Sequence, residues 1–190
     1  METFESIKTI FQSFLLVVAS EMGDKTQLLA LVLTARFKKP FVIMAGILVA
    51  TLLNHGLASY AGGWVSAQIN PEYMKWILFA TFVVFGLWIL IPDKDEGLNE
   101  NYKYGAFLTT LVAFFLAEMG DKTQLATVAL AAEFKAPIAV TIGTTLGMLV
   151  ADGLAVIFGD KLTQKISMKW IRIFACVLFI VFGFGILFYK

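Results

Sequence analysis

The octapeptide EMGDKTQL occurs twice in this sequence, at Glu21–Leu28 and again at Glu118–Leu125. Each copy places two carboxylates and a lysine within a chain that is 59% hydrophobic. On a continuous helix Glu21 and Asp24 would lie about 60° apart on one face, so that both carboxylates could converge on one point. Carboxylate and amide oxygens are the ligands that Mg²⁺, Ca²⁺ and Mn²⁺ prefer. The motif therefore predicts a site for a hard divalent cation.

The amide and the glycine of the motif extend this prediction. Gln27 continues the face of Glu21 and Asp24 and adds an amide oxygen. Gly23 permits either a close helix contact or a local break that exposes backbone carbonyls. If the second copy meets the first near the middle of a membrane, the side chains of both surround one volume. The predicted metal ligands are Glu21, Asp24, Gln27, Glu118, Asp121 and Gln124.

The same carboxylates can hold protons in place of a metal ion, because clustered carboxylates removed from water titrate as a coupled set. This property predicts an exchange of protons for a cation. The alternative, in which Lys25 and Lys122 only neutralise neighbouring acids, is disfavoured because buried ion-pair networks are costly. We expect these lysines either to pair with the carboxylates when no cation is bound or to extend toward the membrane interface.

Other polar residues lie beside the motif or in the middle of apolar segments. Thr26 would lie about 140° from Glu21 on a continuous helix, so its hydroxyl is expected to bond the preceding turn or a neighbouring helix. Asn54 and His55 are matched, 97 residues later, by Ala151 and Asp152. These residues are either helix contacts or a wall of the cation path, on which His55 relays protons. The accessory candidates are Lys25, Thr26, Lys122, Thr123, Asn54, His55 and Asp152.

Six apolar segments of roughly 20 residues must position these side chains, which predicts an all-α integral membrane protein. Pro40, Pro71, Pro92 and Pro137 fall between the segments, where helices are expected to begin or end. The predicted transmembrane helices span residues 8–34, 41–64, 73–91, 104–132, 138–159 and 169–189.

The repeat extends well beyond the octapeptide. At a constant offset of 97 residues, Pro40 aligns with Pro137 and Gly46 aligns with Gly143. Because each unit contains an odd number of spans, the second copy must enter the membrane with the opposite orientation. The sequence therefore predicts two inverted-topology three-helix repeats, residues 1–91 and 104–190, joined by a central linker at residues 92–103.

The distribution of lysine and arginine predicts the orientation of the chain. Nine of these residues lie in the loops after the first, third and fifth spans, and four lie on the opposite side. The positive-inside rule then places both termini on the non-cytoplasmic side. The first residues, METFESIKTIFQ, do not have the features of a signal peptide.

Two E-x-G-D-[KR]-[ST] motifs, one in each half of a small six-helix protein, resemble the signature of the Golgi manganese transporters and their bacterial manganese-exporter relatives. Both copies read EMGDKT here, and the repeat covers nearly the whole chain. The resemblance implies cation–proton antiport of Mn²⁺ or Ca²⁺. The short N-terminal region resembles the bacterial branch and implies Mn²⁺ export across the inner membrane. The motif residues that the resemblance carries over are Glu21, Gly23, Asp24, Lys25, Thr26, Glu118, Gly120, Asp121, Lys122 and Thr123.

The resulting interpretation is a proton-coupled Mn²⁺ exporter that works by alternating access at the carboxylate site. A Ca²⁺/H⁺ antiporter and a passive divalent-cation channel are alternatives, and an intramembrane metal-dependent hydrolase is a distant one. The sequence contains no H-E-x-x-H, G-x-S-x-G or phosphate-loop motif, so we expect neither an enzyme nor a resident cofactor. The expected partners are the transported ion, protons and the lipid bilayer. The net charge of +1 gives no reason to expect nucleic acid, and the sequence leaves the oligomeric state open.

Overall fold

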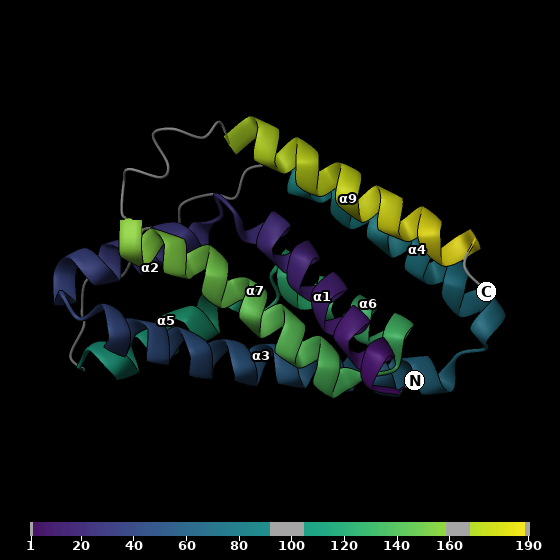
Figure 1. Ribbon diagram of the computed structural model, residues 1–190, viewed down its shortest axis with the longest axis horizontal. Coiled ribbons are helices and arrows are strands. Elements are labelled where there is room, and N and C mark those ends of the chain that lie inside the picture. Colours follow the sequence, from purple (N-terminus) through teal and green to yellow (C-terminus); the bar gives the residue numbers. More distant parts are fainter. Residues whose placement is uncertain (1, 92–104, 159–167, 189–190) are drawn as a thin grey trace.

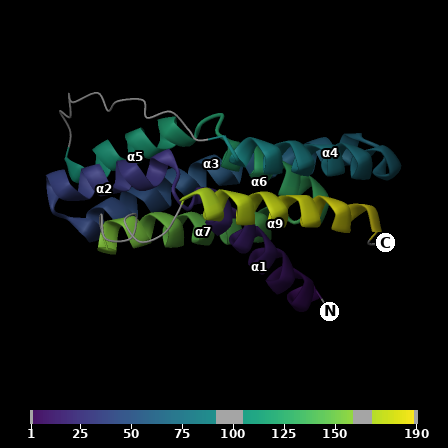
Figure 2. The ribbon, with the colours of Figure 1, turned by 90° about the horizontal axis from the view of Figure 1, so that it is seen from above.

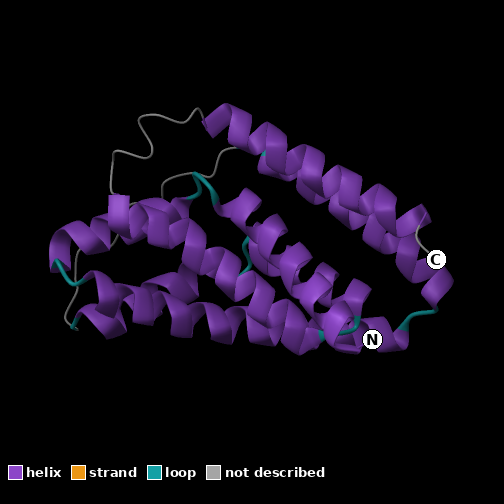
Figure 3. Ribbon diagram, in the orientation of Figure 1, coloured by secondary structure: helices purple, strands orange, loops and turns teal. Residues whose placement is uncertain are grey.

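A computed structural model describes residues 2–91, 105–158 and 168–188, and the regular structure of these residues is entirely helical (Figures 1 and 3). The prediction of an all-α protein is confirmed. The predicted central linker, residues 92–103, lies outside the described residues. The helices are α1 (Glu2–Glu21), α2 (Lys25–Phe37), α3 (Pro40–Gln68), α4 (Pro71–Ile89), α5 (Ala106–Glu118), α6 (Lys122–Phe134), α7 (Pro137–Phe158) and α9 (Met168–Phe188).

Among the described residues, four helices are long and apolar enough to cross a membrane by their length and composition: α3, α4, α7 and α9. They correspond to four of the six predicted spans. Many large apolar side chains on these helices face outward, including Leu57, Trp64 and Phe174. A contiguous apolar exterior of this kind is typical of a protein that lies in a lipid bilayer.

The other two predicted spans, residues 8–34 and 104–132, are each divided into two helices. The first consists of α1 and α2, and the second consists of α5 and α6. In both cases the interruption falls inside the EMGDKTQL motif. Of the two roles that the sequence allows for Gly23, a close helix contact and a local break, the structure shows the break. The continuous helix on which the 60° and 140° separations were calculated is therefore absent.

The broken helices pack mainly against long helices from the opposite half of the chain. α1 and α2 lie against α7, α5 and α6 lie against α3, and α3 also contacts α7. α4 and α9 lie side by side along one edge of the molecule (Figure 1). The N-terminal end of α1 projects away from the other helices (Figure 2). Each copy of the motif is thus held by a helix of the other repeat.

Close helix contacts at glycine recur in the two halves. A Cβ atom added to Gly46 would lie 3.0 Å from the carbonyl oxygen of Phe107, and one added to Gly143 would lie 2.4 Å from that of Ile10. At the offset of 97 residues, Gly143 is equivalent to Gly46 and Ile10 is equivalent to Phe107. The two contacts are therefore the same contact in the two repeats. Only glycine lets the helix backbones approach this closely.

The pair formed by α4 and α9 has the same property. A Cβ atom at Gly86 would lie 3.1 Å from the carbonyl oxygen of Cys176, and one at Gly183 would lie 3.1 Å from the Cβ atom of Phe82. The order of these contacts shows that the two helices run in opposite directions. Phe82 and Phe179, which are equivalent residues of the two repeats, face each other with ring centroids 6.0 Å apart.

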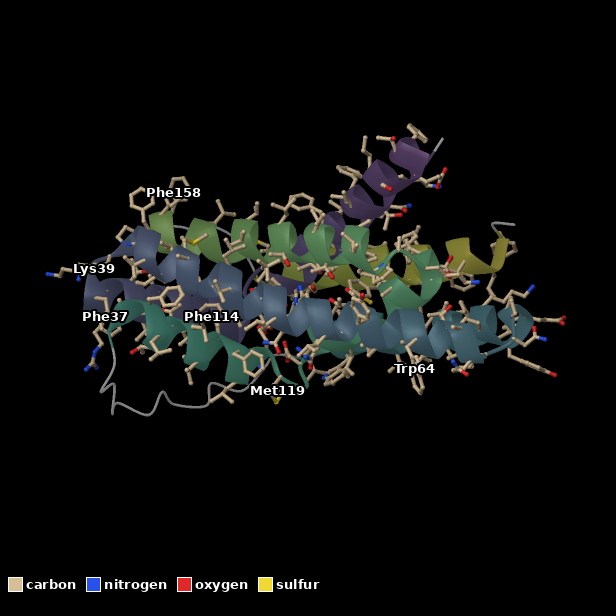
Figure 4. The ribbon with its side chains drawn as sticks, turned by 90° about the horizontal axis from the view of Figure 1, so that it is seen from below. Phe37, Lys39, Trp64, Phe114, Met119 and Phe158 are labelled. Atoms are coloured by element: carbon tan, nitrogen blue, oxygen red, sulfur yellow. The ribbon has the colours of Figure 1, made fainter. Side chains whose placement is uncertain are left out.

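An apolar cluster fills the interior on one side of the motifs. It is built from α2, the first half of α3, α5 and the last part of α7. Figure 4 shows Phe114 between Met119, in the second motif, and the end of the molecule where Phe37, Lys39 and Phe158 lie. The members of this apolar cluster are Leu29, Ala30, Leu33, Ile43, Ile47, Ala50, Phe114, Ala155 and Val156.

Candidate metal site

Both copies of the motif break their helix in the same way. α1 ends at Glu21, Gly23 adopts a φ of +82°, and α2 begins at Lys25. In the second copy Gly120 has a φ of +78°. Residues with a Cβ atom rarely adopt this left-handed conformation, so the break requires glycine. The aspartate that follows each glycine has an extended backbone and precedes the next helix.

The two glutamine side chains stabilise the breaks. The Oε1 atom of Gln27 accepts a hydrogen bond of 2.9 Å from the backbone N–H of Gly23. Gln124 forms the equivalent bond of 2.7 Å with Gly120. Both amide oxygens were predicted to be metal ligands. In the structure each of them binds a backbone N–H group that the helix break would otherwise leave unpaired.

The amide nitrogens of the same glutamines fasten each motif to the other repeat. Gln27 donates to the carbonyl oxygen of Ala151 on α7 at 2.6 Å. Gln124 donates to Oδ1 of Asn54 on α3 at 3.3 Å. Asn54 also donates from Nδ2 to the carbonyl oxygen of Phe115 near the end of α5, at 3.0 Å. Asn54, predicted as an accessory site residue, therefore connects α3 to both sides of the second break.

Three of the four predicted carboxylates come together at the breaks. Glu21, Glu118 and Asp121 each have one carboxylate oxygen within 4.8 Å of the others, and all three side chains are buried. Asp24 is half-buried and does not belong to this group. The reason is the interruption of the helix, since Glu21 ends one helix and Asp24 precedes the next, and they no longer share a helical face.

Both threonines of the motifs bind the same glutamate. The Thr26 hydroxyl donates to Oε2 of Glu21 at 2.8 Å. The Thr123 hydroxyl, from the second motif, donates to Oε1 of Glu21. Thr26 on α2 thus bonds the last residue of α1, the helix that precedes its own, as the sequence led us to expect of its hydroxyl. Thr123, on α6, bonds the same residue from the second motif.

The lysines of the two motifs have different neighbours. Nζ of Lys25 lies 3.2 Å from Oδ1 of Asp121, so this ion pair crosses from the first motif to the second. Lys122 is buried, and its Nζ donates to the carbonyl oxygen of Ile91 beyond the end of α4 at 3.3 Å. The expected pairing of a motif lysine with a carboxylate therefore occurs at Lys25.

The group of carboxylates is removed from solvent. Asp152 is fully buried and lies beside Glu21 and Thr26. Neither carboxylate oxygen of Glu118 accepts a hydrogen bond from any residue that the structure describes. Buried carboxylates this close together need protons or a cation to offset their repulsion. Three carboxylate oxygens form a ligand set that suits Mn²⁺, Ca²⁺ or Mg²⁺.

The interior on the other side of the motifs contains buried polar side chains as well as a second apolar cluster, in which α4 and α9 pack against α6. Ser13, His55, Ser59 and Thr145 are buried there, and their side chains have no hydrogen-bond partner among the described residues. These buried polar side chains, apart from His55, were not among the residues predicted for the site. Equivalent positions of the two repeats show where the two sides of the motifs differ. At three such positions a residue of the apolar cluster around Phe114 aligns with a smaller or polar residue of the other repeat. The pairs are Phe114 with Val17, Ile47 with Thr144 and Val156 with Ser59.

Comparison with known proteins identifies relatives along nearly the whole chain. Residues 9–97 and 106–190 match the family model described as "Divalent cation/proton antiporter GDT1". The chain is 41% identical over 174 residues to the "Putative manganese exporter" of Vibrio cholerae serotype O1, which covers 91% of this chain and 87% of that protein. It is 29% identical over 206 residues to "GDT1-like protein 3" of Oryza sativa subsp. indica, with 95% and 74% covered. No solved structure gives a significant match.

Proposed function

We propose, because this chain belongs to the family of divalent cation/proton antiporters named GDT1, that it exports Mn²⁺ from a bacterial cytoplasm in exchange for protons. The observation that carries this proposal is the buried group formed by Glu21, Glu118 and Asp121, to which both motifs contribute. The name of the Vibrio relative supports Mn²⁺ as the cargo. Ca²⁺ is the second candidate, because the same carboxylate ligands suit it. The family and its relatives are transporters, which leaves no role for an enzyme.

Glu21 and Glu118 are proposed to bind the cation throughout the transport cycle, with one aspartate added at a time. Asp121 completes the group in the present arrangement. Exchange of the two repeats would replace Asp121 by Asp24 and would retain both glutamates. Gln27 and Gln124 are proposed to hold the breaks in shape and to offer the second lone pair of each amide oxygen to the ion.

The proton coupling follows from the ligands. A carboxylate must lose its proton before it binds a metal ion, so metal binding releases protons. After the ion has left to the outside, protons from the outside neutralise the buried group. The transporter can then return to the conformation that is open to the cytoplasm. Proton entry down its gradient would thereby drive Mn²⁺ out of the cell.

Six spans in two inverted repeats are the proposed membrane arrangement, with the pairs α1–α2 and α5–α6 each crossing as a broken helix. The recurrence of the glycine contacts at the 97-residue offset supports it. So does the opposite direction of α4 and α9, which are equivalent helices of the two repeats. With the orientation expected from the lysine and arginine distribution, both termini lie on the non-cytoplasmic side of the inner membrane.

Alternating access would then use the two unlike sides of the site. The apolar cluster around Phe114 lies toward the turn that holds Arg36, Lys38 and Lys39, which the charge distribution assigns to the cytoplasm. The opposite side contains His55 and Ser59. We therefore infer that the described conformation is closed to the cytoplasm.

Reconstituted flux tests this function. The purified chain in liposomes should move Mn²⁺ against its gradient when an opposing proton gradient is imposed, and protons should move in the opposite direction. Measurements with Ca²⁺ in parallel would rank the two ions. Mn²⁺ flux that runs only down its own gradient and ignores the proton gradient would favour the channel, and the absence of any divalent-cation flux from correctly inserted protein would overturn the proposal.

A further inference from the structure

The two glutamates of the candidate site have identical local sequences and unlike surroundings. Glu21 accepts hydrogen bonds from the hydroxyls of Thr26 and Thr123, one on each carboxylate oxygen. Glu118 is equally buried, and neither of its oxygens has a hydrogen-bond partner among the described residues. Since both motifs read EMGDKTQL, the sequence of the motif cannot be the cause of this difference.

Equivalence of the repeats specifies the alternative arrangement. Thr26 stands to Glu21 as Thr123 stands to Glu118, because each threonine follows its glutamate by five residues. In the exchanged arrangement Thr123 would therefore donate to the glutamate of its own motif, and Thr26 would donate to the same glutamate across the interface. Each hydroxyl has a single proton to donate. The two threonines can hold Glu21 or Glu118, but they cannot hold both fully at once.

We propose that Thr26 and Thr123 are positioning residues that transfer together between Glu21 and Glu118 when the transporter changes its access state. This inference rests on the proposed function, in which both glutamates bind the cation. In each state the glutamate that receives both hydroxyls is fixed in place and offers the cation its remaining lone pairs, whereas the other glutamate offers oxygens to which neither threonine donates. The pair of threonines thereby links the geometry of the ligands to the conformation of the whole chain.

Transport kinetics provide the first test. Thr26→Val and Thr123→Val each remove one hydrogen-bond donor in both states. Each variant should therefore reduce the maximal Mn²⁺ flux by about tenfold or more, because a lost hydrogen bond to a charged group changes a rate by about that factor. The Mn²⁺ concentration at half-maximal flux should change much less, because the ligands remain. Thr26→Ser and Thr123→Ser keep the hydroxyl and should restore most of the flux. Unchanged flux in either valine variant would overturn the proposal.

Accessibility of equivalent positions provides the second test, and it does not depend on transport. Ser59→Cys and Val156→Cys, in a chain carrying Cys176→Ser, place one reporter among the buried polar side chains and the other, on the opposite side of the motifs, in the apolar cluster around Phe114. Glu21→Gln leaves a single acceptor oxygen, which favours Glu118 as the acceptor and should raise labelling of the cysteine at position 156 relative to that at position 59. Glu118→Gln should have the opposite effect. Labelling that responds identically to both glutamine variants would contradict the transfer.

The two tests separate this inference from the proposed function. If the unaltered chain carries no divalent cation, the proposed function fails whatever the labelling shows. If it carries Mn²⁺ while the two glutamine variants shift the labelling in the same direction, the transfer of the threonines fails and the transport function stands. Thermal unfolding of each variant in detergent verifies that it is folded before either measurement is interpreted.

Discussion

At the scale of single residues, the carboxylates of Glu21, Glu118 and Asp121 are the groups that a membrane interior tolerates least. Each would cost about 2.5–3.5 kcal/mol at the centre of a helix in the bilayer. Their burial beside one another is therefore informative, since a purely structural role could be filled by apolar side chains at lower cost. The structure adds that the three oxygens come from the ends of three different helices.

Neutral variants of the four motif acids test their role. Glu21→Gln, Asp24→Asn, Glu118→Gln and Asp121→Asn should each lower Mn²⁺ flux by more than about tenfold, because even changes outside the metal ligands commonly cost 10–100-fold in affinity or activity. Each variant keeps the size of the side chain, so insertion into the membrane should persist. Flux is measured in liposomes at matched protein content.

Glu133→Gln is the matched control for these variants. Glu133 lies on α6, is partly buried, and stands outside the group of three carboxylates. The same change of carboxylate to amide should leave flux close to that of the unaltered chain. Unaltered flux in a chain with both Glu118→Gln and Asp121→Asn would contradict a site shared between the motifs.

The sequence was sufficient to mark these residues as candidates, because acids inside an apolar run are costly wherever they lie. It was not sufficient to arrange them. The convergence of Glu21 with Asp24 was argued on an unbroken helix, and a glycine such as Gly23 is compatible with both an unbroken and a broken one. The choice between the two depends on tertiary partners, in particular the carbonyl oxygen of Ala151, which holds the Gln27 side chain that binds Gly23.

At the scale of elements, proline and glycine explain most of what could be predicted. Pro40, Pro71 and Pro137 are the first residues of α3, α4 and α7, because proline fits the first turn of a helix and cannot donate a backbone hydrogen bond. The boundaries of these helices were therefore predicted to within a few residues. Which helices contact one another could not be predicted from these boundaries. A glycine can indicate a close contact, but it does not indicate which helix lies against it.

Substitution of these glycines tests the contacts. Gly143→Ala places a Cβ atom 2.4 Å from the carbonyl oxygen of Ile10, so α1 and α7 must separate, at a cost of about 1–3 kcal/mol. Gly56→Ala is the matched control, because a Cβ atom there meets nothing within 4 Å. Melting temperatures in one detergent should fall for the first variant and stay level or rise slightly for the second. Equal effects of the two substitutions would show that this contact does not limit stability.

At the scale of the whole molecule, the offset of 97 residues predicts the duplication, and the structure shows how the copies are combined. Each broken helix lies on the long helix of the other repeat, α1 and α2 on α7, and α5 and α6 on α3. This exchange could not be deduced from the sequence, because two repeats packed separately would have the same hydrophobic pattern. The exchange brings Glu21 and Glu118 together, although the two residues are far apart in the chain.

The inverted arrangement can be tested by labelling from the two sides of the membrane. Single cysteines at Lys39 and at Ala136, in a chain carrying Cys176→Ser, lie in turns that are equivalent in the two repeats. In sealed vesicles of known orientation, a membrane-impermeant thiol reagent should reach them from opposite sides. Labelling of both from the same side would contradict an inverted repeat, and with it the proposed alternation of Asp24 and Asp121.

The packing of each broken helix against the other repeat also bears on the evolutionary origin and the assembly of this chain. A single three-helix unit would have no long helix of a second unit to pack against its broken helix, and would complete these contacts only by pairing with a second, inverted copy about a two-fold axis. The duplicated chain is in this sense a fused dimer. If the chain is divided between Ile91 and Gly105, we expect the two fragments to assemble into a functional transporter when they are made together, and neither fragment to bind Mn²⁺ as a monomer.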